Sequence, residues 1–110
     1  MKSPLIDDAN INKPLCYDPD RVKFIRYNEI IAGEEKIIRL ETLSDDDFKK
    51  LVIERFRSGP NFTVQAMSGR PHSRDDLIEA IEKNTEFGKE TLLAEKSYIQ
   101  YLLDEIQRGL

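Results

Sequence analysis

The sequence contains one cysteine and one histidine, and this scarcity excludes several kinds of protein. Cys16 has no second thiol in the chain, so an internal disulfide is excluded, which fits a reducing compartment. With only Cys16 and His72 to offer, a zinc site built from cysteines and histidines lacks its ligands.

Long apolar runs are also missing. No segment approaches the roughly 18 apolar residues that a membrane span needs. Residues 1–8 lack the apolar centre of a signal peptide, since a lysine, a proline and two aspartates interrupt them. These features predict a cytoplasmic protein that does not enter a membrane.

The chain has 110 residues, which suits one domain, and a net charge of −4. The charge is unevenly distributed, because residues 74–110 carry nine acids and five bases while residues 1–73 are balanced. An acidic C-terminal segment is repelled by a phosphate backbone. The sequence therefore disfavours nucleic acid as a partner of that segment.

Residues 1–20 show neither a helical nor a strand period, and Pro4, Pro14 and Pro19 interrupt them. We expect an extended N-terminal arm that contains Cys16 as an incidental thiol, with the folded domain over residues 21–110. The alternative is a docking peptide with four anchors: Leu5, Ile6, Ile11 and Leu15.

Two β-like runs follow, over residues 21–31 and 36–43, with Gly33 between them. Because glycine permits the positive φ of a tight turn, the pattern predicts a β-hairpin. Glu, Lys, Arg and Leu are also good helix formers, so a helix over residues 34–43 is the competing interpretation.

Serines followed by acids mark two helix starts. Ser44 precedes three aspartates and an apolar stripe that ends before Pro60. Ser73 with Asp76 three residues later indicates a second start. Between these two helix starts, the side chains of residues 61–67 alternate with a period of two, which predicts a half-buried strand.

These elements predict an α+β fold, with a small three-stranded antiparallel or mixed sheet in the order β-β-α-β-α. A long amphipathic helical segment over residues 74–108 closes the chain. Asn84 and Thr85 are weak helix formers, so a kink or break is expected there.

The C-terminal helix has an apolar or weakly polar arc about 200° wide at 100° per residue, twice the stripe that core packing needs. One seam through this arc suits the protein's own sheet and the other a partner, most simply a second copy of the chain. The alternative is that both seams are internal. The predicted contact residues are Phe87, Ala94, Tyr98, Tyr101, Leu102 and Ile106.

The loop before the second serine cap combines two arginines, a histidine and a helix start, which suits an anion. Its residues are Ser68, Gly69, Arg70, His72, Ser73 and Arg74. The loop matches neither Gly-rich phosphate motif, so a solvated turn is the competing interpretation. His72 has no identifiable nucleophile to activate.

Basic residues alternate with aromatic ones over residues 21–27, a pattern that can bind nucleic acid. Arg21, Lys23 and Arg26 would then act with the loop arginines Arg70 and Arg74. Against this, the basic side chains are split between two strand faces and the pI is about 5.1. The aspartate clusters lack the spacing of a calcium loop, and we expect no metal and no cofactor.

The leading hypothesis is a small non-enzymatic interaction or regulatory protein that self-associates or docks through its C-terminal helix. The first alternative is a dimeric nucleic-acid-binding regulator. The second is a small anion-binding protein or enzyme centred on residues 68–74.

Overall fold

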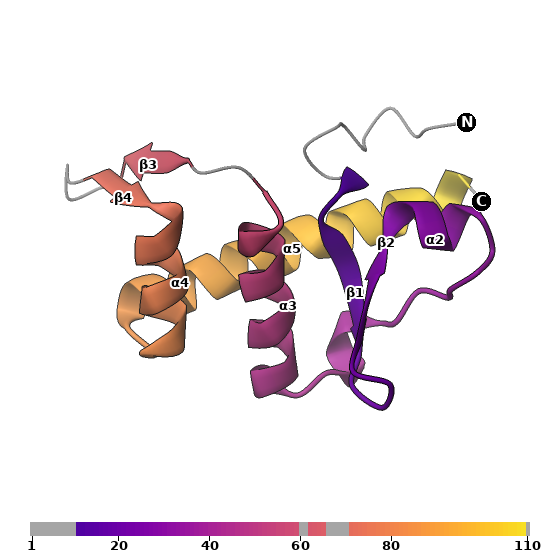
Figure 1. The fold of residues 1–110 in the computed structure, drawn as a ribbon, viewed down its shortest axis with the longest axis horizontal. Helices are drawn as coiled ribbons and strands as arrows, with labels where there is room; N and C mark the ends of the chain where they lie inside the picture. Colours follow the sequence, from indigo (N-terminus) through magenta and orange to yellow (C-terminus); the bar gives the residue numbers. More distant parts are fainter. Residues whose placement is uncertain (1–10, 60–61, 66–70, 110) are drawn as a thin grey trace.

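A computed structural model describes residues 11–59, 62–65 and 71–109 (Figure 1). It confirms a small α+β protein with short antiparallel pairing and a long C-terminal helix. The elements are β1 (Pro14–Asp18), β2 (Lys23–Arg26), α2 (Tyr27–Ile31), the 3-10 helix η1 (Leu40–Thr42), α3 (Asp45–Arg57), β3 (Thr63–Gln65), β4 (Pro71–Ser73), α4 (Arg74–Glu82) and α5 (Glu86–Gly109).

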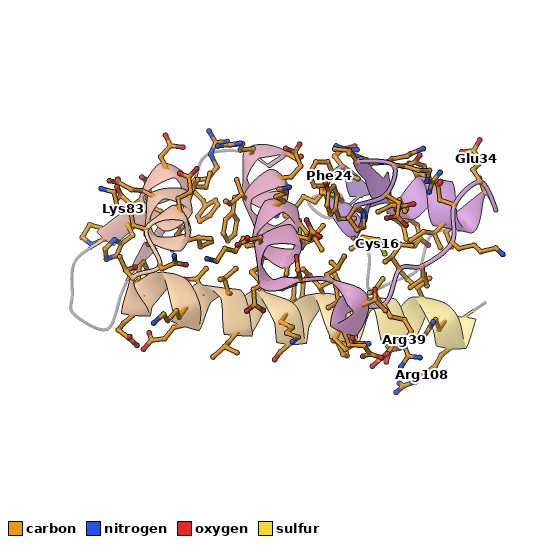
Figure 2. All side chains as sticks on the ribbon, turned by 90° about the horizontal axis from the view of Figure 1, so that it is seen from below. Cys16, Phe24, Glu34, Arg39, Lys83 and Arg108 are labelled. Carbon is orange, nitrogen blue, oxygen red and sulfur yellow. The ribbon has the colours of Figure 1, made fainter. Side chains whose placement is uncertain are left out.

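Helix α5 forms one layer of the molecule. Its 24 residues make it about 36 Å long, most of the 42 Å longest dimension. Figures 1 and 2 show α4, α3 and the β1–β2 pair side by side on the same side of α5. The second layer is therefore a row of short elements, each of which meets a different part of one helix.

The strands form two separate pairs rather than the predicted three-stranded sheet. β1 pairs antiparallel with β2, and β3 pairs antiparallel with β4. The predicted strand at residues 61–67 is present as β3, but its partner β4 was assigned to a loop. Because α3 stands between the two pairs, β3 lies too far from β1–β2 to join their ladder (Figure 1).

The predicted arm was wrong for residues 14–18. These residues form β1, where Leu15, Cys16 and Tyr17 are at most 2% exposed. Asp18 makes the turn to β2, because its carboxylate accepts the backbone N–H of Asp20 at 3.0 Å. The folded domain therefore begins before residue 21, while the proposed anchors Leu5 and Ile6 lie outside the described residues.

The predicted hairpin around Gly33 was also wrong. Gly33 has φ 77° and ends helix α2, with its N–H donating to the carbonyl of Ile30 at 3.1 Å. The N–H of Glu34 donates to the carbonyl of Glu29 at 3.0 Å, which completes a Schellman helix end. Residues 36–43 contain no strand, and only η1 there is helical.

Both serine caps are confirmed. Ser44 Oγ accepts the N–H of Asp47 at 3.1 Å and starts α3. Ser73 Oγ accepts the N–H of Asp76 at 3.2 Å, while the Asp76 carboxylate accepts the N–H of Ser73 at 3.0 Å. This reciprocal capping box fixes the start of α4.

The expected break at Asn84 and Thr85 is confirmed and separates α4 from α5. Asn84 has φ 56°, and the N–H of Thr85 donates to the carbonyl of Ala80 at 3.1 Å. The chain then turns so sharply that Gly88 lies against α4. A Cβ added at Gly88 would lie 2.2 Å from the carbonyl oxygen of Ala80.

The main core lies between the β1–β2 pair and the C-terminal half of α5. Its buried residues are Leu15, Cys16, Tyr17, Ile25, Tyr27, Ile30, Leu40, Leu51, Ile99, Leu102, Leu103 and Ile106. Leu77, Ile78 and Ile81 of α4 are buried outside this cluster. The N-terminal half of α5 thus belongs to a second and smaller packing region.

Candidate functional site

The predicted contact residues on α5 divide into two sets. Leu102 and Ile106 are 1% and 3% exposed and belong to the main core, so their assignment to a partner surface was wrong. Gly88 and Ile99 are buried on the same side of the helix. The seam that runs through these residues is therefore internal.

The other seam remains accessible. Tyr98 and Tyr101 are 40% and 49% exposed, and Ala94 beside them is exposed. We call these three residues the tyrosine face. Phe87, at the end of the same seam, is half-buried because its ring lies 4.6 Å from that of His72.

A buried arginine connects the tyrosine face to the core. Nη1 of Arg55 donates to the carbonyl of Pro14 at 2.9 Å, and its Nε lies 3.6 Å from a carboxylate oxygen of Glu95. Its guanidinium carbon lies 5.9 Å from the Tyr98 ring centre. Burial lowers the pKa of Arg55, and Glu95 opposes that shift.

Sequence reasoning missed the pairing of Arg55 with Glu95, although a signal was present. Arg55 follows Leu51 and Val52 by four and three residues, so it lies on the apolar stripe of α3. Glu95 lies inside the apolar arc of α5. One charge of each sign on two apolar stripes indicates a buried ion pair between them.

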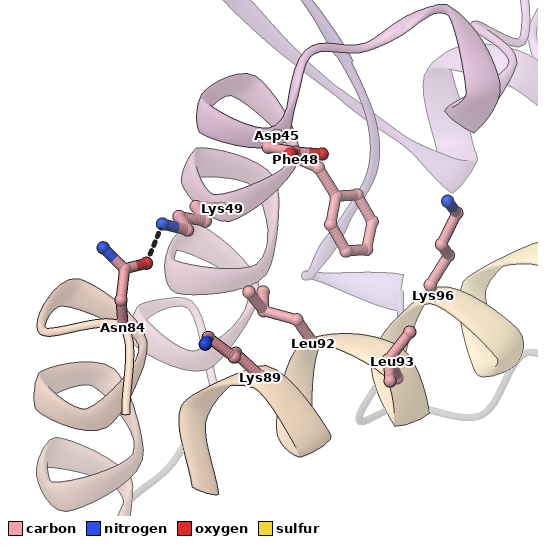
Figure 3. A pocket seen from close by; sticks show the side chains of 8 residues that line it. All are labelled: Asp45, Phe48, Lys49, Asn84, Lys89, Leu92, Leu93 and Lys96. Carbon is pink, nitrogen blue, oxygen red and sulfur yellow. Dashed lines mark hydrogen bonds between the residues drawn. The ribbon is translucent and has the colours of Figure 1, made fainter. Parts of the chain in front are cut away.

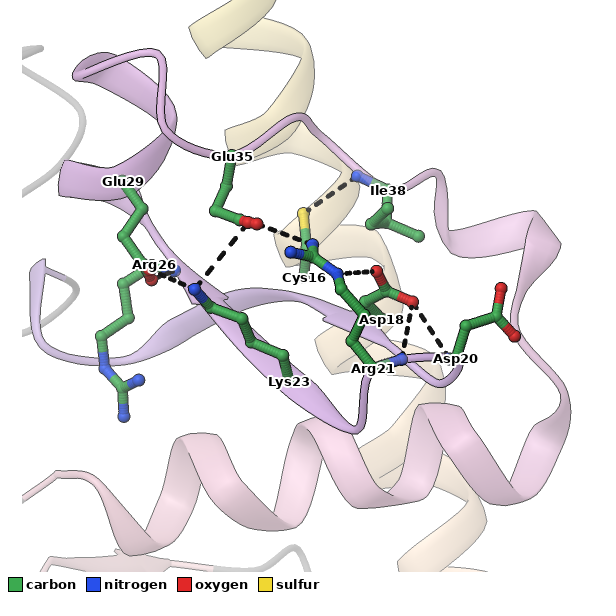
Figure 4. Close-up of polar contacts among 9 residues, drawn as sticks. All are labelled: Cys16, Asp18, Asp20, Arg21, Lys23, Arg26, Glu29, Glu35 and Ile38. Atoms are coloured by element: carbon green, nitrogen blue, oxygen red, sulfur yellow. Dashed lines mark hydrogen bonds and ion pairs between the residues drawn. The ribbon is translucent and has the colours of Figure 1, made fainter.

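The basic residues of β2 and of the turn before it contact acceptors within the chain (Figure 4). Arg21 lies 2.6 Å from Asp18 and 2.6 Å from Glu35, and Lys23 lies 3.0 Å from Glu29. Hydrogen bonds from Arg21 hold the pKa values of Asp18 and Glu35 below their usual range.

The pKa of Glu29 is also lowered, first by the backbone N–H of Arg26 and then by Lys23. Nε of Arg26 donates to the carbonyl of Asn12 at 3.1 Å. Three of the five bases predicted to contact nucleic acid, Arg21, Lys23 and Arg26, thus have acceptors in their own domain.

The predicted anion-binding loop is only partly described. Ser68, Gly69 and Arg70 lie outside the described residues. Ser73 Oγ caps α4, and Arg74 Nη1 donates to the carbonyl of Gly59 at 2.9 Å. Both therefore serve the start of α4, while His72 packs on Phe87.

Cys16 is fully buried, and burial raises the pKa of its thiol to about 11. The sulfur accepts the backbone N–H of Ile38 at 3.4 Å. Within residues 11–59, 62–65 and 71–109, no group of three or more His, Cys, Asp or Glu side chains is placed to hold a metal ion.

A groove of about 370 Å³ lies between the start of α3 and the N-terminal half of α5 (Figure 3). Lys49, Lys89 and Lys96 line it together with one acid, Asp45. The remaining lining residues are Asn84, Phe48, Leu92 and Leu93. We call this site the lysine groove.

Sequence reasoning missed the lysine groove because it treated α5 as an apolar arc facing one or two neighbours. The available signal was Lys89 and Lys96, seven residues apart on one helix, with Leu92 and Leu93 between them. Lys49 could not be placed with them, because the angle between α3 and α5 is a tertiary property.

Comparisons of the chain with protein-family models, with curated proteins and with solved structures give no match. Across the described part of the chain, no helix has both the length and the apolar character that a membrane crossing requires.

Proposed function

We propose that this chain is a non-enzymatic interaction protein that self-associates through the tyrosine face of α5. The exposure of Tyr98 and Tyr101, at 40% and 49%, is the observation that carries the proposal. Tyrosine is enriched at interfaces because it offers a large rigid surface with a polar tip.

Charges at the two ends of this face favour a second copy as the occupant. Glu90 and Arg108 lie on one side of the helix wheel, within about 80° of Ala94, Tyr98 and Tyr101 at 100° per residue. When two copies pair antiparallel with their tyrosines at the centre, Glu90 of each meets Arg108 of the other. Opposite charges at an interface fix orientation and register.

The expected dimer is weak. Arg108 already pairs with Glu105 of its own chain at 2.6 Å, so its pairing with Glu90 adds only a surface contact. A face with two large side chains is also smaller than the roughly 800 Å² per partner of a standard interface. We therefore expect association that depends on concentration rather than a permanent dimer.

The experiment is the absolute mass in solution, measured by light scattering over a concentration series. We expect the mass to rise from 12.8 kDa toward twice that value. Tyr101→Asp should hold the protein at the monomer mass, because it places a carboxylate in the centre of the contact.

Leu93→Asp is the matched control, because Leu93 is 67% exposed on the same helix but lies outside the tyrosine face. It should associate like the original chain. Equal association of the original chain and Tyr101→Asp would show that another surface is responsible.

A further inference from the structure

We infer that the lysine groove binds an acidic peptide segment of a partner protein, with one apolar side chain of that segment seated between the lysines. The groove and the tyrosine face lie on different sides of α5, since Lys89 and Lys96 are about 180° and 160° from Tyr98 on the helix wheel. This inference therefore goes beyond self-association and does not depend on it.

The charge of the groove is opposite to that of the chain. Three ammonium groups face one carboxylate there, although the chain carries a net charge of −4. Asp45 lies in the first turn of α3, where a carboxylate offsets the positive end of the helix dipole. The groove therefore attracts an anion.

The three lysines keep their charge available. Nζ of Lys49 donates to the side-chain amide oxygen of Asn84, a neutral acceptor that positions the ammonium group without cancelling it. Lys96 makes no ion pair with any residue in the described ranges. Lys89 lies 3.5 Å from Glu86, whose side chain is 87% exposed and so interacts with Lys89 only weakly.

Asn84 keeps Lys49 at the edge of the groove because its own backbone is fixed. The turn between α4 and α5 holds Asn84 at φ 56° through the hydrogen bonds that end α4. The site thus combines three elements: the start of α3, the turn after α4, and α5 (Figure 3).

Apolar surface lies between the charges. Phe48 and Leu92 are half-buried in the groove, and Leu93 is 67% exposed at its edge. Covering them removes apolar area from water, so a ligand with an apolar side chain gains free energy that a simple anion does not.

The dimensions favour a peptide. Lys89 and Lys96 are seven residues apart on α5, about 10.5 Å along the axis. Side chains i, i+2 and i+4 of an extended chain share one face, and i and i+4 lie about 13 Å apart, so acids four positions apart reach both lysines through their flexible side chains. A leucine midway between the acids points to the same face and lies over Leu92 and Leu93.

The test uses a capped synthetic peptide, Gly-Glu-Ser-Leu-Ser-Glu-Gly, carrying a fluorescent label. We expect saturable binding in anisotropy titrations with the full chain, and weaker binding as salt is added. The double variant Lys89→Glu/Lys96→Glu should weaken binding by about tenfold or more, because two attractions become repulsions.

Lys36→Glu is the matched control, since Lys36 is an exposed lysine between α2 and η1. It makes the same kind of charge reversal at one lysine rather than two, outside the groove, and should leave the affinity within about twofold. A peptide with glutamine in place of both glutamates, and one with alanine in place of leucine, should each bind more weakly. Circular dichroism and thermal melting verify that the variants fold.

Several results would overturn the inference. These are no binding at millimolar peptide in low salt, equal binding of the glutamine or alanine peptide, and equal losses in Lys36→Glu and the groove variant. A groove variant that lowers the self-association mass would assign the groove to a second copy instead. Tyr101→Asp should bind the peptide normally, so failure of the self-association proposal is seen separately.

Discussion

At the C-terminal end of α5, large side chains make the contact: Ile99, Leu102 and Ile106 lie in the main core with β1 and β2. At the N-terminal end the backbones themselves approach, because Gly88 lies against the carbonyl of Ala80. The first contact buries more apolar surface and contributes more stability, while the second depends on the absence of one Cβ.

The charged side chains near the two ends of α5 also differ, in whether they have carboxylate partners. At the C-terminal end, Arg21 and Lys23 have carboxylate partners within 2.6 to 3.0 Å. At the N-terminal end, Lys49 donates to an amide oxygen, and neither Lys49 nor Lys96 has an ion pair with a described residue. Charges with a carboxylate partner suit a structural region, whereas Lys49 and Lys96, which have no such partner among the described residues, suit a surface that meets a ligand.

The largest expected effect on stability is at Arg55, which lies between the two ends of α5. Arg55→Ala removes the guanidinium that connects β1, α3 and α5, and leaves the Pro14 carbonyl and Glu95 without that donor. Loss of one partner of a buried pair costs roughly 3–5 kcal/mol. We expect a loss of that size in the free energy of unfolding, measured by urea denaturation.

Glu95→Gln is the comparison variant, since it keeps the shape and removes one charge. Because Glu95 is 18% exposed, its loss should cost less than that of Arg55. Equal stability of Arg55→Ala and the original chain would contradict the role of Arg55 in connecting β1, α3 and α5.

The second-largest expected effect on stability should be confined to α4 and the N-terminal end of α5. Gly88→Ala places a methyl group against the backbone of Ala80 and forces α4 away from α5, at a cost of roughly 1–3 kcal/mol. Amide hydrogen exchange should speed up in α4 more than in β1 and β2.

Gly109→Ala is the control on the same helix, because nothing lies within 4 Å of a Cβ added there. It should leave α4 unchanged. Uniform loss of protection in both variants, or in neither, would remove the distinction between the two ends.

Acid should first weaken the region of β1, β2 and α2, which packs near the C-terminal end of α5. Asp18, Glu29 and Glu35 have pKa values below their usual range, so the unfolded chain takes up protons more readily than the folded one. Their contribution is present above the unfolded values near 4 and is lost as pH falls through the lowered folded values.

The thermal midpoint should therefore drop between about pH 5 and pH 3, and less steeply in Glu35→Gln, which removes one of the three groups. A midpoint that does not change over this range would mean that these pairs do not stabilise the fold.

The smallest expected effect concerns the reactivity of the Cys16 thiol. Burial raises the pKa of Cys16 to about 11, so the folded chain exposes almost no thiolate at neutral pH. We expect a disulfide reagent to label Cys16 only when β1 separates from the C-terminal half of α5, at a rate that rises with urea. Immediate labelling of the folded protein would contradict the burial of β1.

Much of the helical structure was predictable, because local chemistry decides it. Ser44 and Ser73 start α3 and α4 as their sequences indicate, and the weak helix formers Asn84 and Thr85 mark the break. The β1–β2 pair was not predictable in the same way. Pro14 and Pro19 at its edges suggested a terminus, and Gly33 fits both a hairpin turn and a helix end.

The candidate site was predictable only in part. The excess width of the apolar arc led to α5, but periodicity cannot say which seam is covered. That choice depends on where β1 and α3 pack, so Leu102 and Ile106 were assigned to the wrong side. The lysine groove needed the crossing of α3 over α5, which no local pattern encodes.

The most direct test of the central claim is a charge exchange at the ends of the tyrosine face, read by light scattering at high protein concentration. Glu90→Arg and Arg108→Glu should each lower the dimer fraction, and the double exchange should restore it, because the pairs are then reversed but intact. A mass of 12.8 kDa for the original chain at every concentration, or a double exchange no better than either single variant, would contradict antiparallel self-association through α5.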